Sequence, residues 1–273
     1  MNVLYCGDQN MKDGLLISIL SLLKEEPRVL KIFIVTAFID AGDKKYYPLS
    51  NQDVGVLDTL VKQHNSDNQV LKIDITDMFA AQVPQNNLTT VFTPGCMLRL
   101  FADELPELPN KILYLDTDVI CRKDFSLFYA QALKDTELVG VLDHYGKWFF
   151  HHSASKLDYI NSGVMLLNLD MIRKTQLFVR CRQLCQSKKM FMPDQSAINK
   201  LATTKKIMPR RFNEQRRLHK NTVFQHFTTS FRIFPWIHTL TVKPWEVERV
   251  HKQLKLHEYD DILAQYSQLI GKM

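Results

Sequence analysis

Short apolar segments alternate with amphipathic ones along the first third of the chain. Residues Val3–Cys6, Val29–Ala37 and Gln69–Ile75 are rich in apolar and β-branched side chains, which is typical of buried strands. Between them, apolar residues recur with helical spacing from Asp13 to about Lys24 and from Gln52 to Asn65. Because strands that alternate with helices favour a parallel sheet covered by helices, the pattern predicts an α/β fold.

The middle of the chain supplies further strands. One expected strand begins at Lys111 and ends at the Asp116–Asp118 pair, and Leu138–Asp143 and Gly163–Leu169 are further expected strands. Leu98–Glu104 is expected to lie on a helix before the first of them. The apolar run Leu15–Leu23 is too short to span a bilayer and is interpreted as a core helix. Without a leader segment, the expected location is the cytoplasm.

Length and composition fit one large α/β domain with a small addition. The chain has 273 residues, of which 45% are hydrophobic and 23% charged, as in ordinary globular proteins. After Trp245, the residues Val247, Val250 and Leu254 have helical spacing, which indicates an amphipathic helix. We therefore expect one domain over residues 1–245 and a C-terminal helical extension over 246–273, packed on or beside it.

The charge distribution points to an anionic partner. The formal net charge is +6, which on its own leaves open nucleotide diphosphates, an anionic lipid surface and nucleic acid. Eight Lys and Arg residues stand against the single acid Glu214 between residues 200 and 220. This basic segment is either a solvated face, or a loop that faces an anion or a membrane surface. The five cysteines are odd in number and lack a zinc spacing, so free thiols are expected.

The strongest chemical signal is a pair of carboxylates, Asp116 and Asp118, at the end of the strand that begins at Lys111. In a regular strand both would point to the same face, where two like charges are unfavourable unless a cation lies near them. Hard divalent ions such as Mg²⁺ or Mn²⁺ prefer carboxylate oxygen and often bind phosphate as well. The pair predicts a metal site for a phosphorylated ligand; a turn with two solvated Asp residues is the alternative.

Four later motifs, together with the Asp116–Asp118 pair, decide between these interpretations. They are Asn161-Ser-Gly163, Pro193-Asp194-Gln195, His226-Phe-Thr and Lys243-Pro-Trp245. In this order the set resembles glycosyltransferase family 8, the retaining sugar transferases with a GT-A-type, Rossmann-like nucleotide-sugar-binding fold and a mostly parallel central sheet. The resemblance extends from Val3 to about Trp245. It implies metal-dependent transfer of a hexose, glucose or galactose, from a UDP-sugar donor to a glycan, lipid-linked or protein-linked acceptor in bacterial surface-glycan assembly.

The resemblance also implies roles for residues that would bind the nucleotide. Asp8 would read the uracil ring with Asn10 nearby, and Arg99 would contact the diphosphate or the donor sugar. Lys243 would bind the diphosphate, and Thr117 belongs to the same nucleotide-sugar set as the two aspartates. The chain departs from the family pattern in the loop before Asp8, where Cys6-Gly7 replaces two small residues, and at Met11, where an aromatic residue is frequent.

The donor sugar and the catalytic step are expected to involve four more residues. The resemblance places Asp143, Asn161 and Asp194 at the sugar hydroxyls, and Gln195 near the reacting face of the anomeric carbon. Gln195 and Asp194 are thus the catalytic candidates. Because a carboxamide is a poor nucleophile, we favour same-face substitution through an ion-pair-like transition state, in which the leaving phosphate helps to deprotonate the acceptor.

The third metal ligand is expected to be a histidine, and two candidates precede Lys243. His226 matches the local sequence of the family motif, whereas His238 matches the short spacing to Lys243 better. We favour His226, because Thr222–Gln225 is interpreted as the strand that delivers it. The ion would be Mn²⁺ or Mg²⁺, bound by Asp116, Asp118 and this histidine.

Two other classes of protein are alternatives to the glycosyltransferase interpretation. A haloacid-dehalogenase-type phosphatase also ends a strand in Asp-x-Asp, but near its chain start, and it would leave the later motifs unexplained. A nucleic-acid-binding module would need exposed aromatic residues within the basic segment, where only Phe212 occurs. The acceptor pocket is expected from residues 144–159 and from the basic segment, and peripheral contact with the inner face of a membrane is a further expectation.

Overall fold

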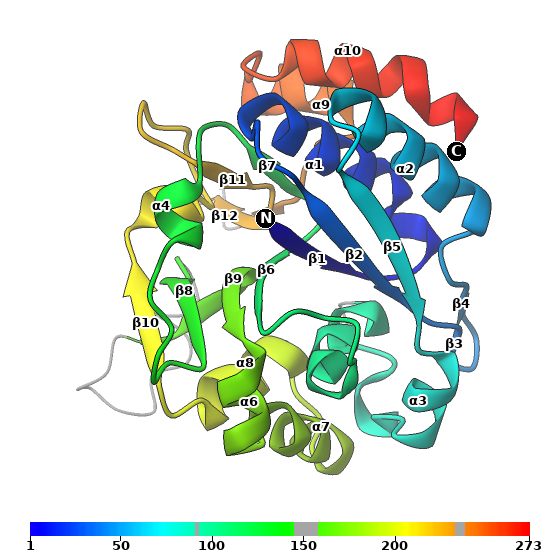
Figure 1. Cartoon of the computed structure of the whole chain (residues 1–273), viewed down its shortest axis with the longest axis vertical. Helices are drawn as coiled ribbons and strands as arrows, with labels where there is room; N and C mark the ends of the chain where they lie inside the picture. The colour runs from blue at the N-terminus through cyan, green and yellow to red at the C-terminus, as the bar shows by residue number, and fades with distance from the viewer. Residues whose placement is uncertain (91–92, 145–157, 233–237) are drawn as a thin grey trace.

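A mixed seven-stranded sheet forms the centre of the computed structural model, which describes residues 1–90, 93–144, 158–232 and 238–273 (Figure 1). Its strands are β1 (Asn2–Cys6), β2 (Lys31–Thr36), β5 (Gln69–Asp74), β6 (Lys111–Leu115), β8 (Leu138–Leu142), β9 (Ile160–Asn168) and β10 (Lys205–Met208). Their order is β10-β8-β9-β6-β1-β2-β5, and β9 runs antiparallel to both neighbours while the other pairs are parallel. The predicted α/β fold with a mostly parallel sheet is confirmed.

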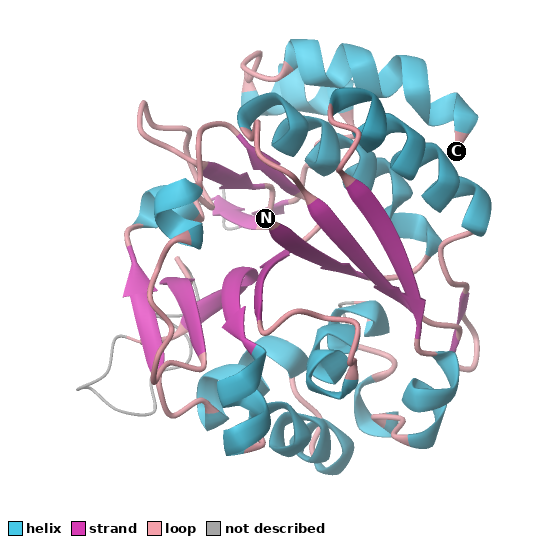
Figure 2. Ribbon diagram, in the orientation of Figure 1, coloured by secondary structure: helices cyan, strands magenta, loops and turns pink. Residues whose placement is uncertain are grey.

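Helices cover both faces of this sheet (Figure 2). The helices on one face are α1 (Lys12–Glu25), α2 (Asn51–His64) and α10 (Asp260–Leu269), and those on the other are η3 (Pro94–Glu104), α6 (Leu169–Thr175), α7 (Leu177–Ser187) and α8 (Pro193–Leu201). The pleat of β1 divides its side chains accordingly, since Val3 and Tyr5 join the first core and Leu4 joins the second.

Short elements complete the chain. These are η1 (Gln9–Met11), β3 (Ile39–Asp40), β4 (Lys45–Tyr46), α3 (Thr76–Ala81), η2 (Gln85–Asn87), β7 (Val119–Cys121), α4 (Ser126–Tyr129), η4 (Arg210–Phe212), β11 (Phe224–His226), β12 (Ser230–Arg232), β13 (His238–Leu240), α9 (Val247–Arg249), η5 (Val250–Leu254) and η6 (Ile270–Lys272). Of these, the antiparallel pair β7 and β11 lies outside the main sheet and has the greatest consequence for the site.

The structure confirms two of the predicted elements and refines both. The expected helix before β6 is η3, which is a 3-10 helix. The expected strand from Lys111 is β6, which ends at Leu115 directly before the two aspartates, and a separate short strand, β7, begins at Val119. The apolar run of α1 does lie in the core, with every residue from Gly14 to Leu23 buried. None of the helices among the described residues has both the length and the apolar character needed to span a bilayer.

The C-terminal residues pack against α1. The predicted helical spacing after Trp245 corresponds to α9 and the π-helical turn η5, and α10 follows. Ile262 and Leu263 of α10 are buried in the core that contains α1, and the Tyr266 hydroxyl donates to Asp13 Oδ1 at 2.5 Å. The division of the chain at residue 245 stays a prediction, and these contacts describe how the last helix is held.

We predict that α10 contributes substantially to folding stability. Replacing the buried Leu263 by Ala should lower the free energy of unfolding by about 2–5 kcal/mol, because it removes packed methyl groups and leaves a cavity. The exposed Gln265 of the same helix is the matched control, and Gln265→Ala should change stability by less than about 0.5 kcal/mol. Equal urea midpoints for the two variants would show that α10 is only loosely attached.

Candidate active site

The turn that follows β6 carries the two aspartates. Asp116–Asp118 form a tight turn, in which the Val119 amide donates to the Asp116 carbonyl at 3.2 Å and the Asp116 amide donates to the Gly163 carbonyl at 2.8 Å. The prediction that both carboxylates share the face of a regular strand is therefore wrong. The turn nevertheless directs both carboxylates toward one histidine.

That histidine is His226, the last residue of β11. The antiparallel register of β7 and β11 places His226 opposite Val119, directly after Asp118. Its Nε2 atom lies 3.1 Å from Asp118 Oδ1 and 3.7 Å from Asp116 Oδ2. One ligand atom from each of the three residues lies within 4.8 Å of the others, so the group has the spacing of a metal site. The alternative, His238, lies in β13, and its side chain is outside the described residues.

Lys243 completes the charge balance of this group. Its Nζ donates to Asp118 Oδ2 at 2.5 Å and to the Phe227 carbonyl at 3.2 Å. Burial acts to raise the pKa of Asp118, but Lys243 and His226 outweigh it and hold that pKa well below its ordinary value. Burial likewise acts to lower the pKa of His226, and Asp118 outweighs it and raises that pKa. Lys243 and His226 thus stabilise the ionised form of the Asp118 carboxylate.

Gly163 of β9 provides the space in which the histidine and the carboxylate meet. A Cβ atom at this position would lie 2.2 Å from His226 Cε1 and 2.7 Å from Asp116 Oδ2. Among the residues that the structure describes, the buried Nδ1 atom of His226 has no hydrogen-bond partner, while its Nε2 atom faces the two carboxylates. Two carboxylates and an imidazole nitrogen around a cradle that only glycine leaves open fit a divalent cation.

Arg99 connects the turn to the neighbouring helix α8. Its Nη2 donates to Asp116 Oδ1 at 2.8 Å, and its Nε lies 3.3 Å from Asp194 Oδ2. Nη1 donates to the Ser162 carbonyl at 2.8 Å, and the guanidinium lies 4.1 Å from the centroid of the Tyr114 ring. Arg99 is almost fully buried, and the carboxylates of Asp116 and Asp194 outweigh the effect of burial and raise its pKa. The residue therefore fixes two carboxylates at once.

Gln195, Asp143 and Ser162 form a second buried polar group beside Arg99. Gln195 Oε1 accepts from the Ser162 amide at 2.9 Å, and Gln195 Nε2 donates to Asp143 Oδ2 at 3.1 Å. The Ser162 hydroxyl lies within hydrogen-bonding distance, 3.3 Å, of Asp194 Oδ2. Ser162 is thus the link between the two catalytic candidates, Asp194 and Gln195.

The basic segment contributes one side chain, Asn213, to this polar group. Asn161 Nδ2 donates to Asp143 Oδ2 at 3.0 Å, and Asn161 Oδ1 accepts from Asn213 Nδ2 at 2.9 Å. Asn213, Glu214 and Gln215 are buried, although they lie between exposed arginines in the sequence. The sequence suggested either a solvated face or a loop that faces an anion or a membrane. Neither interpretation predicted that the centre of the segment is buried and bonded to Asn161.

The loop after β1 lies on the other side of η3. Asp8 is buried, and its Oδ1 atom accepts from the Asn10 amide at 2.8 Å and from Asn10 Nδ2 at 2.6 Å. A Cβ atom on Gly95 of η3 would lie 3.3 Å from Gly7 Cα, so this loop touches the helix that carries Arg99. Similarly, a Cβ atom on Gly14 of α1 would lie 2.6 Å from the Thr117 carbonyl oxygen. Close packing therefore brings the Asp8 loop and the aspartate turn to the same end of the sheet.

Every predicted site residue thus lies at this end of the sheet in three connected groups. Asp116, Asp118, His226 and Lys243 form the first, Arg99 and Asp194 the second, and Asp143, Asn161 and Gln195 the third, with Asp8, Asn10 and Thr117 in the adjoining loops. Three residues that hydrogen-bond to these groups were not predicted from the sequence: Tyr114, Ser162 and Asn213. Tyr114 stands two residues before Asp116, which was a usable signal, whereas nothing in the sequence marked Asn213.

Comparison with known proteins identifies the family of the chain. The sequence profile of Glycosyl transferase family 8 matches residues 2–248. A lipopolysaccharide 1,2-glucosyltransferase of Escherichia coli is 27% identical over 301 aligned positions, which cover 95% of this chain and 84% of that protein. A lipopolysaccharide 1,3-galactosyltransferase of Salmonella typhimurium is 24% identical over 62% of this chain and 49% of its own length.

A solved structure shows the same fold. The crystal structure of the galactosyltransferase LgtC in complex with donor and acceptor sugar analogues matches with a TM-score of 0.69 at 16% identity, over the full length of both chains. The chain belongs to glycosyltransferase family 8. The predicted GT-A-type fold and glycosyltransferase activity are thereby confirmed. Family membership also decides against the phosphatase and nucleic-acid alternatives.

The cysteines of this family 8 glycosyltransferase are free, as expected. Cys6 and Cys96 lie close to Arg99 and Asp194, but burial raises the pKa of both thiols. A thiol with a raised pKa is a poor nucleophile at neutral pH. These two thiols are therefore unsuited to act as nucleophiles.

We predict that Gly163→Ala damages metal binding without unfolding the glycosyltransferase. The new methyl group would displace the His226 ring or the Asp116 carboxylate, so Mn²⁺ affinity should fall at least about tenfold, the scale seen when ligand positioning is lost. Gly55→Ala is the matched control, because its Cβ meets nothing and Ala favours a helix interior. Paramagnetic titration with Mn²⁺ measures both, and equal affinities would show that Gly163 does not shape the site.

Proposed function

We propose that this glycosyltransferase moves a hexose, glucose or galactose, from a UDP-sugar to a glycan acceptor of the lipopolysaccharide type with retention of anomeric configuration. We assign the cofactor as Mn²⁺ or Mg²⁺, held by Asp116, Asp118 and His226. The observation that carries the proposal is the convergence of these three side chains and Lys243 at the end of β6.

The composition of the metal group favours a hard divalent ion once the donor is bound. Two carboxylates supply oxygen ligands, one imidazole supplies nitrogen, and a diphosphate would add further oxygens. Such an ion would neutralise charge that develops on the departing diphosphate. Lys243 supports the same assignment, because its ammonium group donates to Asp118 from a position beside the metal ligands.

Binding of the nucleotide is assigned to the loop after β1. Ligands of doubly wound sheets lie beyond the carboxyl ends of the strands, and the Asp8 loop follows β1, next to β6, in the sheet. A carboxylate in this position accepts a hydrogen bond from the N–H group of a pyrimidine base. Asn10 holds the Asp8 carboxylate in place through two hydrogen bonds, which would orient it toward the base.

The reaction is assigned to same-face substitution. The bond from the anomeric carbon to the diphosphate oxygen breaks, the acceptor hydroxyl oxygen bonds to that carbon on the same face, and its proton passes to the departing diphosphate. Asp194 is held by Arg99 and by the Ser162 hydroxyl, which disfavours it as a covalent nucleophile. Gln195 is fixed at both ends of its carboxamide and is suited to bind the sugar near its anomeric carbon.

The acceptor is assigned from the relatives and the charge. Two relatives carry names of lipopolysaccharide glycosyltransferases, one for glucose and one for galactose, so both hexoses belong to the proposal. A chain of net charge +6 is suited to an anionic glycolipid or to peripheral contact with the cytoplasmic face of a membrane. Residues 145–157 of the expected acceptor loop lie outside the described residues. Lipid-linked and protein-linked glycans remain the other acceptor classes to test.

We predict that the aspartates and His226 are required for metal-dependent transfer. Asp118→Asn should reduce Mn²⁺-dependent UDP-hexose transfer at least about a hundredfold, because a metal ligand and the partner of Lys243 are lost together. His226→Ala should shift the Mn²⁺ titration to higher concentration, and His238→Ala is the matched control with an unchanged curve. A normal titration for His226→Ala with a shifted one for His238→Ala would reverse the ligand assignment.

We predict that exposed arginines of the basic segment act on the acceptor and not on the donor. Arg216 and Arg217 are exposed, and their positive field extends about 8–10 Å at physiological salt. The double substitution to Gln should raise KM for an anionic acceptor severalfold and leave donor hydrolysis by water unchanged. The exposed Lys31 and Lys62, changed together to Gln, give a control of equal charge. Equal loss of hydrolysis and transfer would place the arginines at the donor instead.

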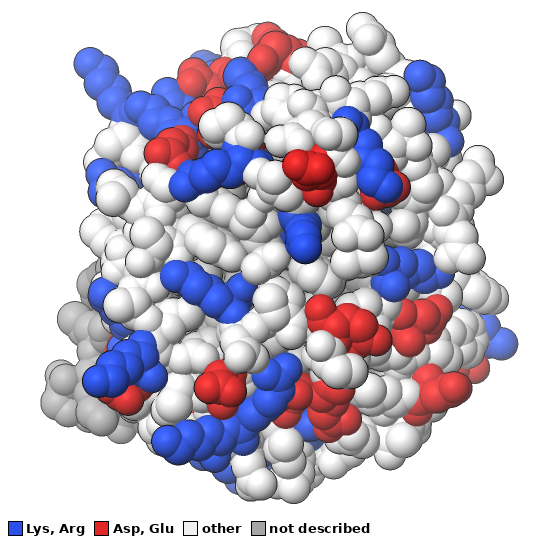
Figure 3. Space-filling model, viewed as in Figure 1, with Lys and Arg blue, Asp and Glu red and all other residues white. Residues whose placement is uncertain are grey.

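Arg216 and Arg217 are the suitable pair for substitution, because the other two arginines of the basic segment, Arg210 and Arg211, have contacts that hold the structure together. Arg210 pairs with the buried Glu214, and Arg211 lies over the ring of Phe212. On the face shown in Figure 3, basic and acidic side chains are interspersed. A two-residue substitution that leaves the contacts of Arg210 and Arg211 intact is therefore the appropriate size of test.

A further inference from the structure

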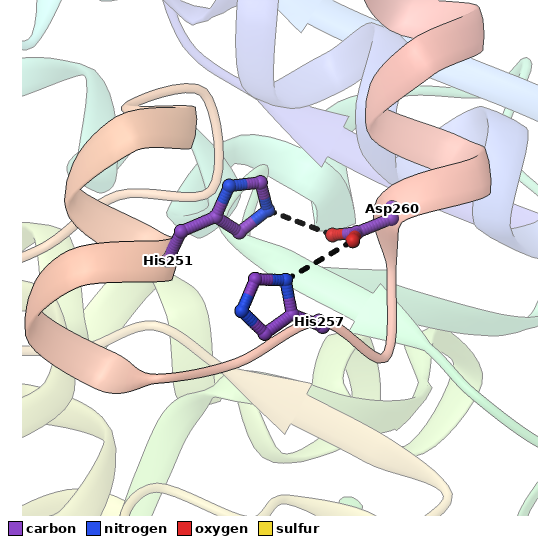
Figure 4. A group of neighbouring side chains, drawn as sticks. All are labelled: His251, His257 and Asp260. Atoms are coloured by element: carbon purple, nitrogen blue, oxygen red, sulfur yellow. Dashed lines mark hydrogen bonds and ion pairs between the residues drawn. The ribbon is translucent and has the colours of Figure 1, made fainter.

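A second group of metal-ligating side chains lies near the C-terminus, outside the active site. His251, His257 and Asp260 point toward one another, from η5, from the loop after it and from the first residue of α10 (Figure 4). His251 Nε2 lies 2.7 Å from Asp260 Oδ1, and His257 Nδ1 lies 3.1 Å from Asp260 Oδ2. One ligand atom from each residue lies within 4.8 Å of the others. Within the described residues, only this group and that of Asp116 have such spacing.

The backbone that presents these side chains is irregular. His251 lies in the π-helical turn η5, and Lys255, the residue after η5, has left-handed dihedral angles of φ 52° and ψ 41°. Left-handed backbone is unfavourable for a residue that is not glycine, and π-helical turns occur frequently at functional sites. Together, the π-helical turn and the left-handed residue reverse the direction of the chain, so that His257 faces His251. An irregular backbone that brings two ligands together is consistent with a binding site.

The two imidazole rings are stacked on each other. Their centroids lie 4.5 Å apart with an interplanar angle of 20°. Stacked rings at this distance repel each other when both are protonated, and one carboxylate, Asp260, serves both of them. A divalent ion that binds one nitrogen of each ring and the carboxylate would keep both imidazoles neutral and supply the positive charge that Asp260 attracts.

We propose that His251 Nε2, His257 Nδ1 and the Asp260 carboxylate bind a transition-metal ion of the zinc class. Two imidazoles favour Zn²⁺ over Mg²⁺ or Mn²⁺, whereas the active site offers mainly oxygen ligands. The chain would then hold two metal sites of different selectivity. All three residues are at least partly exposed, so the ion would reach the site from solvent and complete its coordination with water.

The bound ion would act as a clip on the C-terminal segment. It joins η5 to the start of α10, and α10 packs on α1 through Tyr266 and Asp13. Because an ion that binds only the folded state stabilises that state, zinc should raise the melting temperature. The inference does not depend on the proposed sugar-transfer reaction, since none of its residues belongs to the active site.

The test uses the full-length, untagged chain with a thiol reductant and excess Mg²⁺ to occupy the active site. Zinc affinity is measured by competition with a chromogenic chelator, and the melting temperature is measured with and without ZnCl₂. His251→Ala and His257→Ala should each weaken zinc binding at least about tenfold and abolish the zinc-dependent rise in Tm. His64→Ala, which removes an exposed histidine at the end of α2, is the matched control and should behave as wild type.

Two results would overturn the proposal. One is zinc affinity in His257→Ala equal to that of wild type. The other is a Tm that falls by the same amount in the variants with and without zinc, which would show that the three residues form hydrogen bonds only. If an alanine variant fails to fold, Asp260→Asn keeps hydrogen-bond acceptors while removing the anionic ligand. Undiminished zinc binding in Asp260→Asn would then contradict the site, and its loss would support it.

Discussion

The site depends on one electrostatic constraint, which is that the carboxylates of Asp116 and Asp118 lie in the same tight turn. Like charges at this separation are unfavourable unless cations compensate them. The compensating groups arrive from different parts of the chain: Arg99 on η3, His226 on β11 and Lys243 after β13. Three segments distant in sequence therefore fold around two carboxylates, and a divalent ion fits where these charges converge.

The single reversed strand of the sheet explains how the remaining groups reach this point. Because β9 is antiparallel to β6 and β8, its first residues lie beside the carboxyl ends of both neighbours. Asn161, Ser162 and Gly163 lie among these first residues. Asn161 contacts Asp143, Ser162 accepts from Arg99, and Gly163 lies against His226 and Asp116. The antiparallel strand β9 thus contacts both the group around Asp116 and the group around Asp143.

The sequence was sufficient to predict the layers, the mostly parallel sheet and a set of polar residues that meet at one end of that sheet, because buried strands and ordered motifs leave local signals. It misled at Asp116 and Asp118, where regular strand geometry was expected to put both carboxylates on one face and the chain instead makes a turn between β6 and β7. It gave no sign of Asn213, whose burial depends on the tertiary position of a segment that is polar in sequence. The left-handed Lys255 was equally hidden, since no glycine marks it. The local pattern of apolar and polar residues predicted the helices and strands. Packing between segments distant in sequence determined which polar residues lie together.

Anomalous diffraction from crystals grown with Mn²⁺ and UDP tests the central claim most directly. The account predicts one strong manganese peak between the carboxylates of Asp116 and Asp118 and the Nε2 atom of His226, with the diphosphate of UDP as a further ligand and the Lys243 ammonium group beside it. A peak at another place, or UDP bound at this end of the sheet with no metal at these three residues, would contradict it.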